Sequence, residues 1–447
     1  PPLAQPEPVP PPGAIQPAEP PAAPLPEVAP APLPAEPAPL DAPFAAPVVP
    51  DEAEPAWYDT IAFNAFADAY YSLDFNFPKG RVPNPIRAYD NHDGFSLSWV
   101  GLDVEKAPEP VGGVISLRFG PTAERIGASC VDGECDDEYG LSVVKQGFVS
   151  WKPGGSESAV RLDLGKFDTP YGAEVAEAQY NFNYTRGALY WLGQPVFHTG
   201  LRMVADLDRA FSLKLLAVNG WNRTVDNNLG KTFGLQGTLR VPATDGSDSD
   251  LVTVSLGYLV GPEWDDFVEI DCPTGTTPDA SEPDGCEEDP DGEGGQLLVD
   301  RGGSNTEGLR HFLDLTVTAT PIPQLGMFLN GSLGIDNQRS ATNLDEFDTA
   351  LWWGVAAAAR YALDERMGIA ARGEYFNDHD GYATGFAPLE IGVVTGTLTF
   401  DYSPATPVKL FVDGRIDWSN RQIFPKQVRE MSGTAVSLTV GAVVATY

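Results

Sequence analysis

The chain has 447 residues and a formal net charge of −35 at pH 7, because 63 acidic residues outnumber 28 lysines and arginines. This excess of negative charge argues against nucleic acid as a partner, since nucleic-acid sites need a basic surface. The sequence has no apolar run of about 18 residues or more, the length that a membrane-spanning helix requires. Any crossing of a membrane must therefore use strands.

Residues 1–56 form a compositionally distinct N-terminal segment. They hold 21 of the 42 prolines, eight acidic residues and no basic residue. Proline cannot donate the backbone hydrogen bonds of a helix interior or a sheet, so we predict a disordered, extended periplasmic tail. The tail is either a plain spacer or a tether to the cell wall or a periplasmic protein. No initiator methionine or basic leader precedes it, so we expect a secretory signal to have been removed.

From about residue 60 onward, short segments alternate apolar and polar residues between turns. In residues 61–75 every odd-numbered position is apolar, whereas the even-numbered positions include Asn64, Asp68 and Asp74. Strands of this kind are typical of a transmembrane β-barrel, the closed sheet that satisfies every backbone group in lipid. We predict an all-β outer-membrane barrel domain over residues 57–447. Its sixteen strands are predicted at residues 60–77, 94–106, 111–120, 141–152, 157–167, 198–206, 210–219, 231–242, 250–260, 308–320, 323–336, 349–362, 366–377, 389–402, 406–419 and 432–447.

The connections between these strands alternate between short turns and long loops, as in barrels whose short turns face the periplasm. Residues 187–192 could form a further strand. We assign them to a long third loop, residues 168–197, because an extra strand would break the alternation and give an odd strand number. The apolar pattern slips in residues 95–104 and again in the last strand, where a bulge near Val443 would return Tyr447 to the outer face.

Charged residues occupy the face of the strands opposite the apolar one. Charges in a dry core would be costly, and a sixteen-stranded barrel is wide, so the pattern predicts a water-filled lumen. Some of these charges are expected to pair across strands. The residues predicted to line the pore are Arg118, Arg161, Asp163, Arg202, Lys214, Arg240, Arg310, Asp314, Arg360, Arg372, Glu374, Lys409, Asp413 and Arg415.

The third loop is rich in aromatic residues and asparagine, unlike the acidic outer loops. We expect it to fold into the lumen. There Asp168, Glu174, Glu177 and Arg186 would form a constriction, because charges at the narrowest point decide which solutes pass. The alternative is that the loop packs on the rim and meets no solute.

The four cysteines form two local pairs, Cys130 with Cys135 and Cys272 with Cys286, each in a glycine- and acid-rich loop. We predict two disulfides. Zinc is a weaker interpretation, because the chain has no Cys-x-x-Cys motif and no histidine near either pair. Residues 261–306 hold fourteen acidic residues and a single arginine, so this fifth loop is either a hydrated anionic surface or a Ca²⁺ site. We expect no other metal or cofactor.

His92 and His379 each lie beside aspartates in predicted outer loops. Such a pair could activate water, since a carboxylate can orient a histidine base. The same Asp, Asn and Gly residues are explained by turn formation, however, and the chain has no Gly-x-Ser-x-Gly motif. We therefore expect no enzymatic activity and no catalytic residue.

Several motifs resemble the OmpL-like β-barrel porin family, and the resemblance extends over roughly residues 57–447. It implies a bacterial outer-membrane porin for the passive entry of small solutes, and a homotrimer by analogy with porins of this size. The similar segments are residues 162–174 (LDLGKFDTPYGAE), 183–186 (NYTR), 193–202 (GQPVFHTGLR), 219–221 (NGW), 226–228 (DNN) and 372–378 (RGEYFND).

Pattern and resemblance together predict a porin in the outer membrane of a Gram-negative bacterium. It would form a water-filled diffusion channel for small hydrophilic solutes or ions, with its outer face in lipid. The alternative is a structural or adhesive surface protein whose plugged barrel serves only as an anchor.

Overall fold

A computed structural model describes most of the chain from residue 57 onward. The predicted tail, residues 1–56, lies outside the described residues, as do His92, Glu282, Asp284 and Tyr447. The described residues are 57–79, 84–87, 93–127, 129–131, 134–136, 138–243, 249–265, 267–279, 286–300, 308–339 and 347–446.

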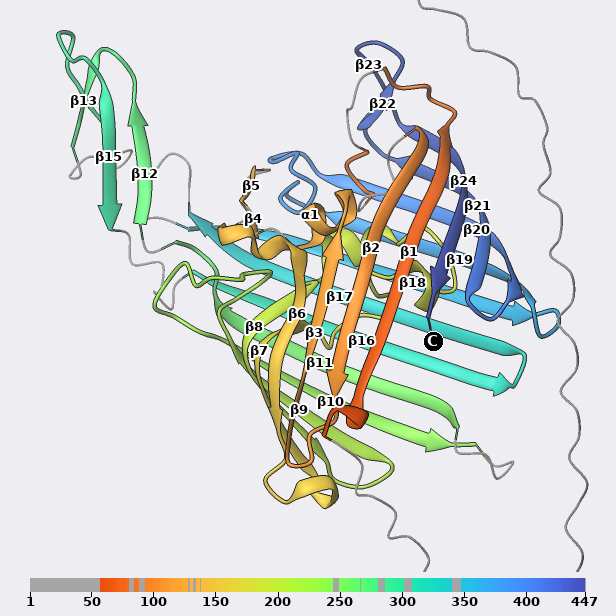
Figure 1. The fold of residues 1–447 in the computed structure, drawn as a ribbon. Helices are drawn as coiled ribbons and strands as arrows, with labels where there is room; N and C mark the ends of the chain where they lie inside the picture. The colour runs from red at the N-terminus through yellow and green to blue at the C-terminus, as the bar shows by residue number, and fades with distance from the viewer. Residues whose placement is uncertain are drawn as a thin grey trace, which may run out of the picture. The chain divides into compact units, whose positions relative to one another are not determined.

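Within the described residues, sixteen antiparallel strands form one closed barrel, which confirms the predicted fold and strand number (Figure 1). Each barrel strand pairs with the next along the chain, and β1 closes the ring by pairing with β24. The barrel strands are β1 (Ile61–Asp74), β2 (Gly94–Lys106), β3 (Val111–Phe119), β6 (Val144–Trp151), β7 (Val160–Asp168), β8 (Phe197–Asp206), β9 (Phe211–Val218), β10 (Thr232–Pro242), β11 (Asp250–Pro262), β16 (Leu309–Ile322), β17 (Leu325–Arg339), β18 (Phe347–Ala362), β19 (Met367–Asp378), β20 (Ile391–Ala405), β21 (Val408–Ser419) and β24 (Thr434–Ala445).

The remaining elements are short and lie outside the barrel strands. Among the described residues, none of the helices is both long and apolar enough to span a membrane. The short strands are β4 (Ser129–Val131), β5 (Glu134–Asp136), β12 (Phe267–Cys272), β13 (Thr276–Pro278), β14 (Cys286–Glu288), β15 (Gly295–Asp300), β22 (Phe424–Lys426) and β23 (Glu430–Ser432). The helical segments are α1 (Pro121–Gly127), the 3-10 turns Trp57–Thr60, Glu138–Val143, Gly155–Glu157 and Ala178–Tyr180, and the π-helical turn Leu189–Gly193.

The barrel reverses the usual distribution of apolar and polar side chains. Leu164 and Leu398 are 64% and 57% exposed on its outer face, whereas Asp163 and Asp417 are fully buried on its inner face. This arrangement follows from the alternation of side chains along a strand, combined with an apolar solvent outside. The odd-numbered apolar residues predicted on the outer face of β1 accordingly include exposed Phe63.

The two irregular strands differ from each other. In β2, Asp68 faces Trp99 and Ala69 faces Leu97, so Ser98 is an extra residue, and this bulge accounts for the slip in the pattern. The bulge predicted near Val443 is wrong. Strand β24 pairs with β1 and with β21 without a register shift, because its own two-residue alternation is unbroken.

Short turns and long loops alternate around the barrel, as predicted. We call the two ends of the barrel the short-turn end and the long-loop end. The third loop connects β7 to β8 at the long-loop end, and its residues 187–192 form no strand, since Leu189–Gly193 is a π-helical turn.

Candidate functional site: the third loop and the inner wall

The third loop crosses the interior of the barrel. The backbone N–H of Gly172 donates to Asp314 on β16 (3.0 Å), and that of Thr185 donates to Asp413 on β21 (2.9 Å). The loop starts from β7, so these contacts lie on strands far from it around the ring. The ribbon of the loop is visible between the strands in Figure 1. The loop therefore meets inward-facing side chains on widely separated parts of the wall rather than resting on the rim.

A buried ion-pair cluster fixes the first half of the loop. The Glu177 carboxylate accepts hydrogen bonds from Arg118 on β3 (2.8 Å) and from Lys145 on β6 (3.0 Å), and Lys145 also lies 2.5 Å from Asp168. Burial acts to raise the pKa of Glu177, but the two nearby cations outweigh it and lower the pKa to about 2. Glu177 thus stays ionised and ties the loop to two strands.

A second ion-pair cluster holds the middle of the loop. Arg372 on β19 contacts Glu174 of the loop and Glu374 of its own strand, each at 2.6 Å. Glu174 also accepts a hydrogen bond from the backbone N–H of Gly187 (2.8 Å), so it joins two parts of the loop to the wall. All three charged side chains are buried. The single positive charge of Arg372 balances only one of the two carboxylates.

Arg186, the fourth predicted constriction residue, is buried as well. Its carbonyl oxygen accepts a hydrogen bond from Arg415 (2.6 Å), which also pairs with Asp417 at 2.7 Å. The guanidinium of Arg186 donates to the carbonyl of Tyr184. Glu174, Glu177 and Arg186 therefore hold the loop in place. That they set the narrowest cross-section for solutes stays a prediction.

Two aromatic rings of the third loop pack against glycines of the barrel wall. The sequence did not predict these contacts. A Cβ atom on Gly257 would come within 2.4 Å of a ring carbon of Tyr171, and one on Gly441 within 2.4 Å of a ring carbon of Tyr184. Both tyrosines are buried, and the Tyr171 hydroxyl donates to the carbonyl of Tyr258 (3.1 Å). A glycine at an inward-facing strand position could have indicated them, because the missing side chain leaves space for a ring to approach the wall.

Comparison with known proteins assigns this barrel to a family. Residues 60–445 match the family described as "Putative beta-barrel porin-2, OmpL-like". The chain belongs to this porin family. None of the curated proteins with which the sequence was compared is significantly similar to it.

Solved outer-membrane barrels share the fold of the porin. The outer membrane channel DcaP of Acinetobacter baumannii is 10% identical, with 86% of this chain and 97% of that chain covered and a TM-score of 0.52. The anion-selective porin from Comamonas acidovorans is 10% identical, with 86% and 99% covered and a TM-score of 0.50. OprB of Pseudomonas putida is 10% identical, with 87% and 94% covered and a TM-score of 0.50. At such low identity these likenesses establish the fold alone.

Other charges predicted on the inner wall of the porin form local pairs. Arg310 on β16 lies 2.8 Å from Asp336 on the neighbouring strand, and Arg360 on β18 lies 2.6 Å from Asp401. The Lys409 ammonium donates to a loop carbonyl, that of Gln179, at 3.3 Å. A further group of bases, on β7 to β10, is described below. Pairing across strands was expected, but the sequence did not identify the partners.

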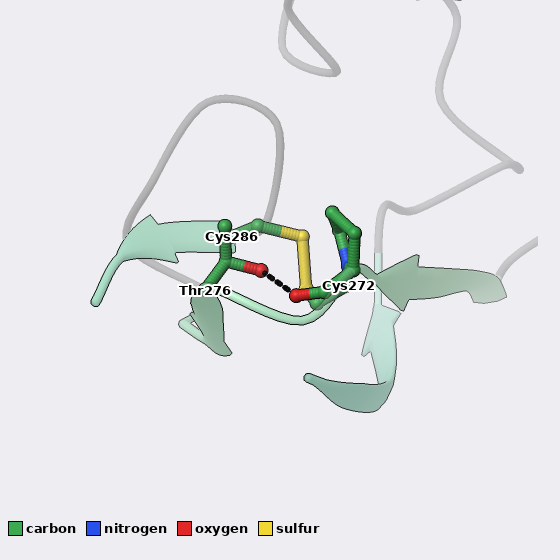
Figure 2. Close-up of a disulfide and its surroundings, with 4 residues drawn as sticks. Cys272, Thr276 and Cys286 are labelled. Atoms are coloured by element: carbon green, nitrogen blue, oxygen red, sulfur yellow. Dashed lines mark hydrogen bonds between the residues drawn. A yellow bond between two sulfur atoms is a disulfide. The ribbon is translucent and has the colours of Figure 1, made fainter. Parts of the chain in front are cut away.

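The fifth loop of the porin carries the one disulfide that the structure places among the described side chains. Cys272 and Cys286 are bonded, with their Cα atoms 5.6 Å apart, and the Thr276 hydroxyl donates to a nearby carbonyl, that of Pro273 (Figure 2). Cys130 and Cys135 face each other in the β4–β5 hairpin, but their side chains lie outside the described part, so this second disulfide stays a prediction.

The metal and catalytic alternatives depend in part on residues outside the described part of the chain, among them His92. Among the described residues, no group of three or more His, Cys, Asp or Glu side chains could hold a metal ion. Several acidic residues of the fifth loop, among them Glu282 and Asp284, lie outside those residues, so calcium binding there stays a prediction. His379 is exposed, and its backbone N–H donates to the carbonyl of Leu351 (2.9 Å).

Proposed function

We propose that this porin forms a water-filled channel through the outer membrane of a Gram-negative bacterium, and that small hydrophilic solutes or ions cross it by passive diffusion. One observation carries the proposal: the inner wall bears charged side chains that solvent reaches, with Arg161 36% and Arg360 27% exposed. Partly exposed charges inside a barrel require water around them. Passive diffusion needs no cofactor and no catalytic residue.

We extend the proposal to a homotrimer, by analogy with porins of this size. The short-turn end would then face the periplasm, and the tail at residues 1–56 would extend from that side toward the cell wall or a periplasmic protein. The mass of the detergent-solubilised complex tests the assembly, because the monomer has a mass of 47.8 kDa. A complex with the mass of one chain would contradict the trimer.

Single-channel conductance in a planar bilayer tests the channel itself. The purified full chain is first shown to be folded by its heat-modifiable mobility on a denaturing gel. We expect stable current steps from the folded protein and none from the heated protein. Folded, inserted protein that produces no steps would contradict the proposal.

One observation favours the anchor as a second candidate. Apolar side chains from three outer loops pack with the wall into a single buried cluster that includes Ile86, Leu189, Trp352, Ile423 and Phe424. This cluster joins loops that are far apart in the sequence, and it narrows the long-loop end of the barrel. If folded protein gives no current, this cluster and the third loop together would make the barrel a plugged anchor.

A further inference from the structure

Four bases on successive strands form a strip on the inner wall toward the short-turn end. Arg161 lies on β7, Arg202 on β8, Lys214 on β9 and Arg240 on β10, so each of these strands contributes one member. The strand register brings Arg161 and Lys214 into one row, since both are opposite Val204. We call these four residues the basic ladder. The other three bases interact electrostatically with the Lys214 ammonium, so they form one charged surface.

Two members of the basic ladder have neutral hydrogen-bond partners. The Lys214 ammonium donates to the Gln236 side-chain oxygen (2.9 Å), and Arg240 donates to the hydroxyl of Ser212 (3.1 Å). Gln236 in turn donates to the carbonyl of Pro170 in the third loop (2.5 Å). The basic ladder therefore lies beside the start of the third loop, the segment that crosses the lumen.

The acidic residues of the inner wall do not cancel this charge. Asp163 is fully buried and holds both Arg161 (3.0 Å) and Arg202 (2.8 Å). Two further acids on the ladder strands lie near these bases. Asp168, at the end of β7, interacts with Arg202 but is paired with Lys145 at 2.5 Å, and Asp206, at the end of β8, lies near Lys214. Elsewhere on the inner wall most acidic side chains are buried. Glu105 on β2 is one that solvent reaches. Water at the basic ladder thus meets more positive than negative charge, although the chain as a whole is strongly acidic.

We propose that the basic ladder is an anion-recognition strip that makes the porin selective for small solutes carrying an oxyanion, a carboxylate or a phosphate. The inference rests on the proposed function, since a strip in the lumen selects solutes only if the channel conducts. Guanidinium groups match the geometry of oxyanions through paired N–H donors, and ammonium groups add a mobile point charge. Rings or strips of Arg and Lys select anions in other pores.

The test replaces the two bases that have neutral partners, because their removal leaves no buried acid without its cation. The Lys214→Gln/Arg240→Gln variant is compared with Lys152→Gln/Arg366→Gln, which removes the same charge from two short turns outside the lumen wall, where Lys152 is half-buried and Arg366 exposed. Reversal potentials are recorded in a KCl gradient at about 0.1 M salt, where screening is moderate. We expect the wild-type chain to prefer chloride to potassium. The preference should fall about fivefold in the ladder variant and remain in the control.

Current block by succinate and by inorganic phosphate, added separately, then identifies the oxyanion. Block that is lost in the ladder variant supports the proposal, and the probe that blocks better identifies the class. A cation-preferring wild-type channel, or a ladder variant with unchanged reversal potential and block, would overturn it.

Titration calorimetry of the detergent-folded barrel with the same two probes separates this inference from the proposed function. Suppose that the wild-type protein binds a probe at least tenfold more tightly than the ladder variant but carries no current. This result would overturn the channel and retain the recognition strip. Current without any anion preference would overturn the strip alone.

Discussion

The Glu177→Gln substitution should loosen the third loop. The wild-type carboxylate is buried and accepts hydrogen bonds from Arg118 and Lys145. Its pKa is lowered from 4.5 to about 2 by these cations, which outweigh the effect of burial. One pKa unit corresponds to about 1.4 kcal/mol, so the ionised form contributes about 3 kcal/mol. Removing one partner of a buried ion pair typically costs about 3–5 kcal/mol, which agrees. We therefore expect a shift of roughly a hundredfold toward the undocked loop.

The same contact predicts a dependence on pH. Because the folded-state pKa of Glu177 lies below its ordinary value of 4.5, the contribution is fully present above that value. It is lost as the pH falls from about 5 toward about 2, when the carboxylate takes up a proton. The wild-type loop should therefore loosen in this window, and the Glu177→Gln loop should be loose already at pH 7.

Open-channel current noise and conductance report the loop, because it crosses the lumen. The wild-type chain should be quiet at pH 7 and noisy at pH 3, whereas the Glu177→Gln chain should be noisy at both. Glu157→Gln, the same change in an exposed short turn, is the matched control and should behave as the wild type. Equal noise and conductance in the Glu177→Gln and wild-type chains at pH 7 would refute the reasoning.

Three further predictions follow from other contacts. Arg372→Met leaves two buried carboxylates without their cation, so the free energy of unfolding in urea should fall by about 3–5 kcal/mol, and an unchanged unfolding midpoint would contradict this. Replacing Cys272 and Cys286 by serine should remove about 3 kcal/mol of local stability, so that a glutamate-specific protease cleaves the fifth loop faster while the barrel keeps its heat-modifiable mobility. Gly257→Val places methyl groups against a third-loop ring and should change the conductance, whereas lipid-facing Gly373→Val should not.

The sequence predicted the barrel well because one physical rule governs its strands. Lipid outside and polar groups inside impose an alternation of period two, and each strand reports it independently. The strand that slipped, β2, slipped at Ser98, where a bulge adds one residue. The mistaken bulge near Val443 arose from the terminal aromatic residue alone, although the alternation within β24 was unbroken.

The contacts of the third loop could not be predicted in the same way. Its composition indicated that it folds inward, but the partners of Glu177 lie on β3 and β6, and the partner of Glu174 lies on β19. Those pairings depend on the path of the loop across the lumen, which no local pattern encodes. The glycines under Tyr171 and Tyr184 are also evident only once the ring positions are known.

The pairing of β1 with β24 has a consequence for how the chain reaches its final state. The backbone N–H of Ala65 donates to the side chain of Thr446, 381 residues later, so the seam joins the first strand to the last (2.8 Å). A chain that lacks β24 would keep two unpaired sheet edges, which are templates for aggregation. The ring can therefore close only after the final strand has been delivered, and both edges stay unpaired until then.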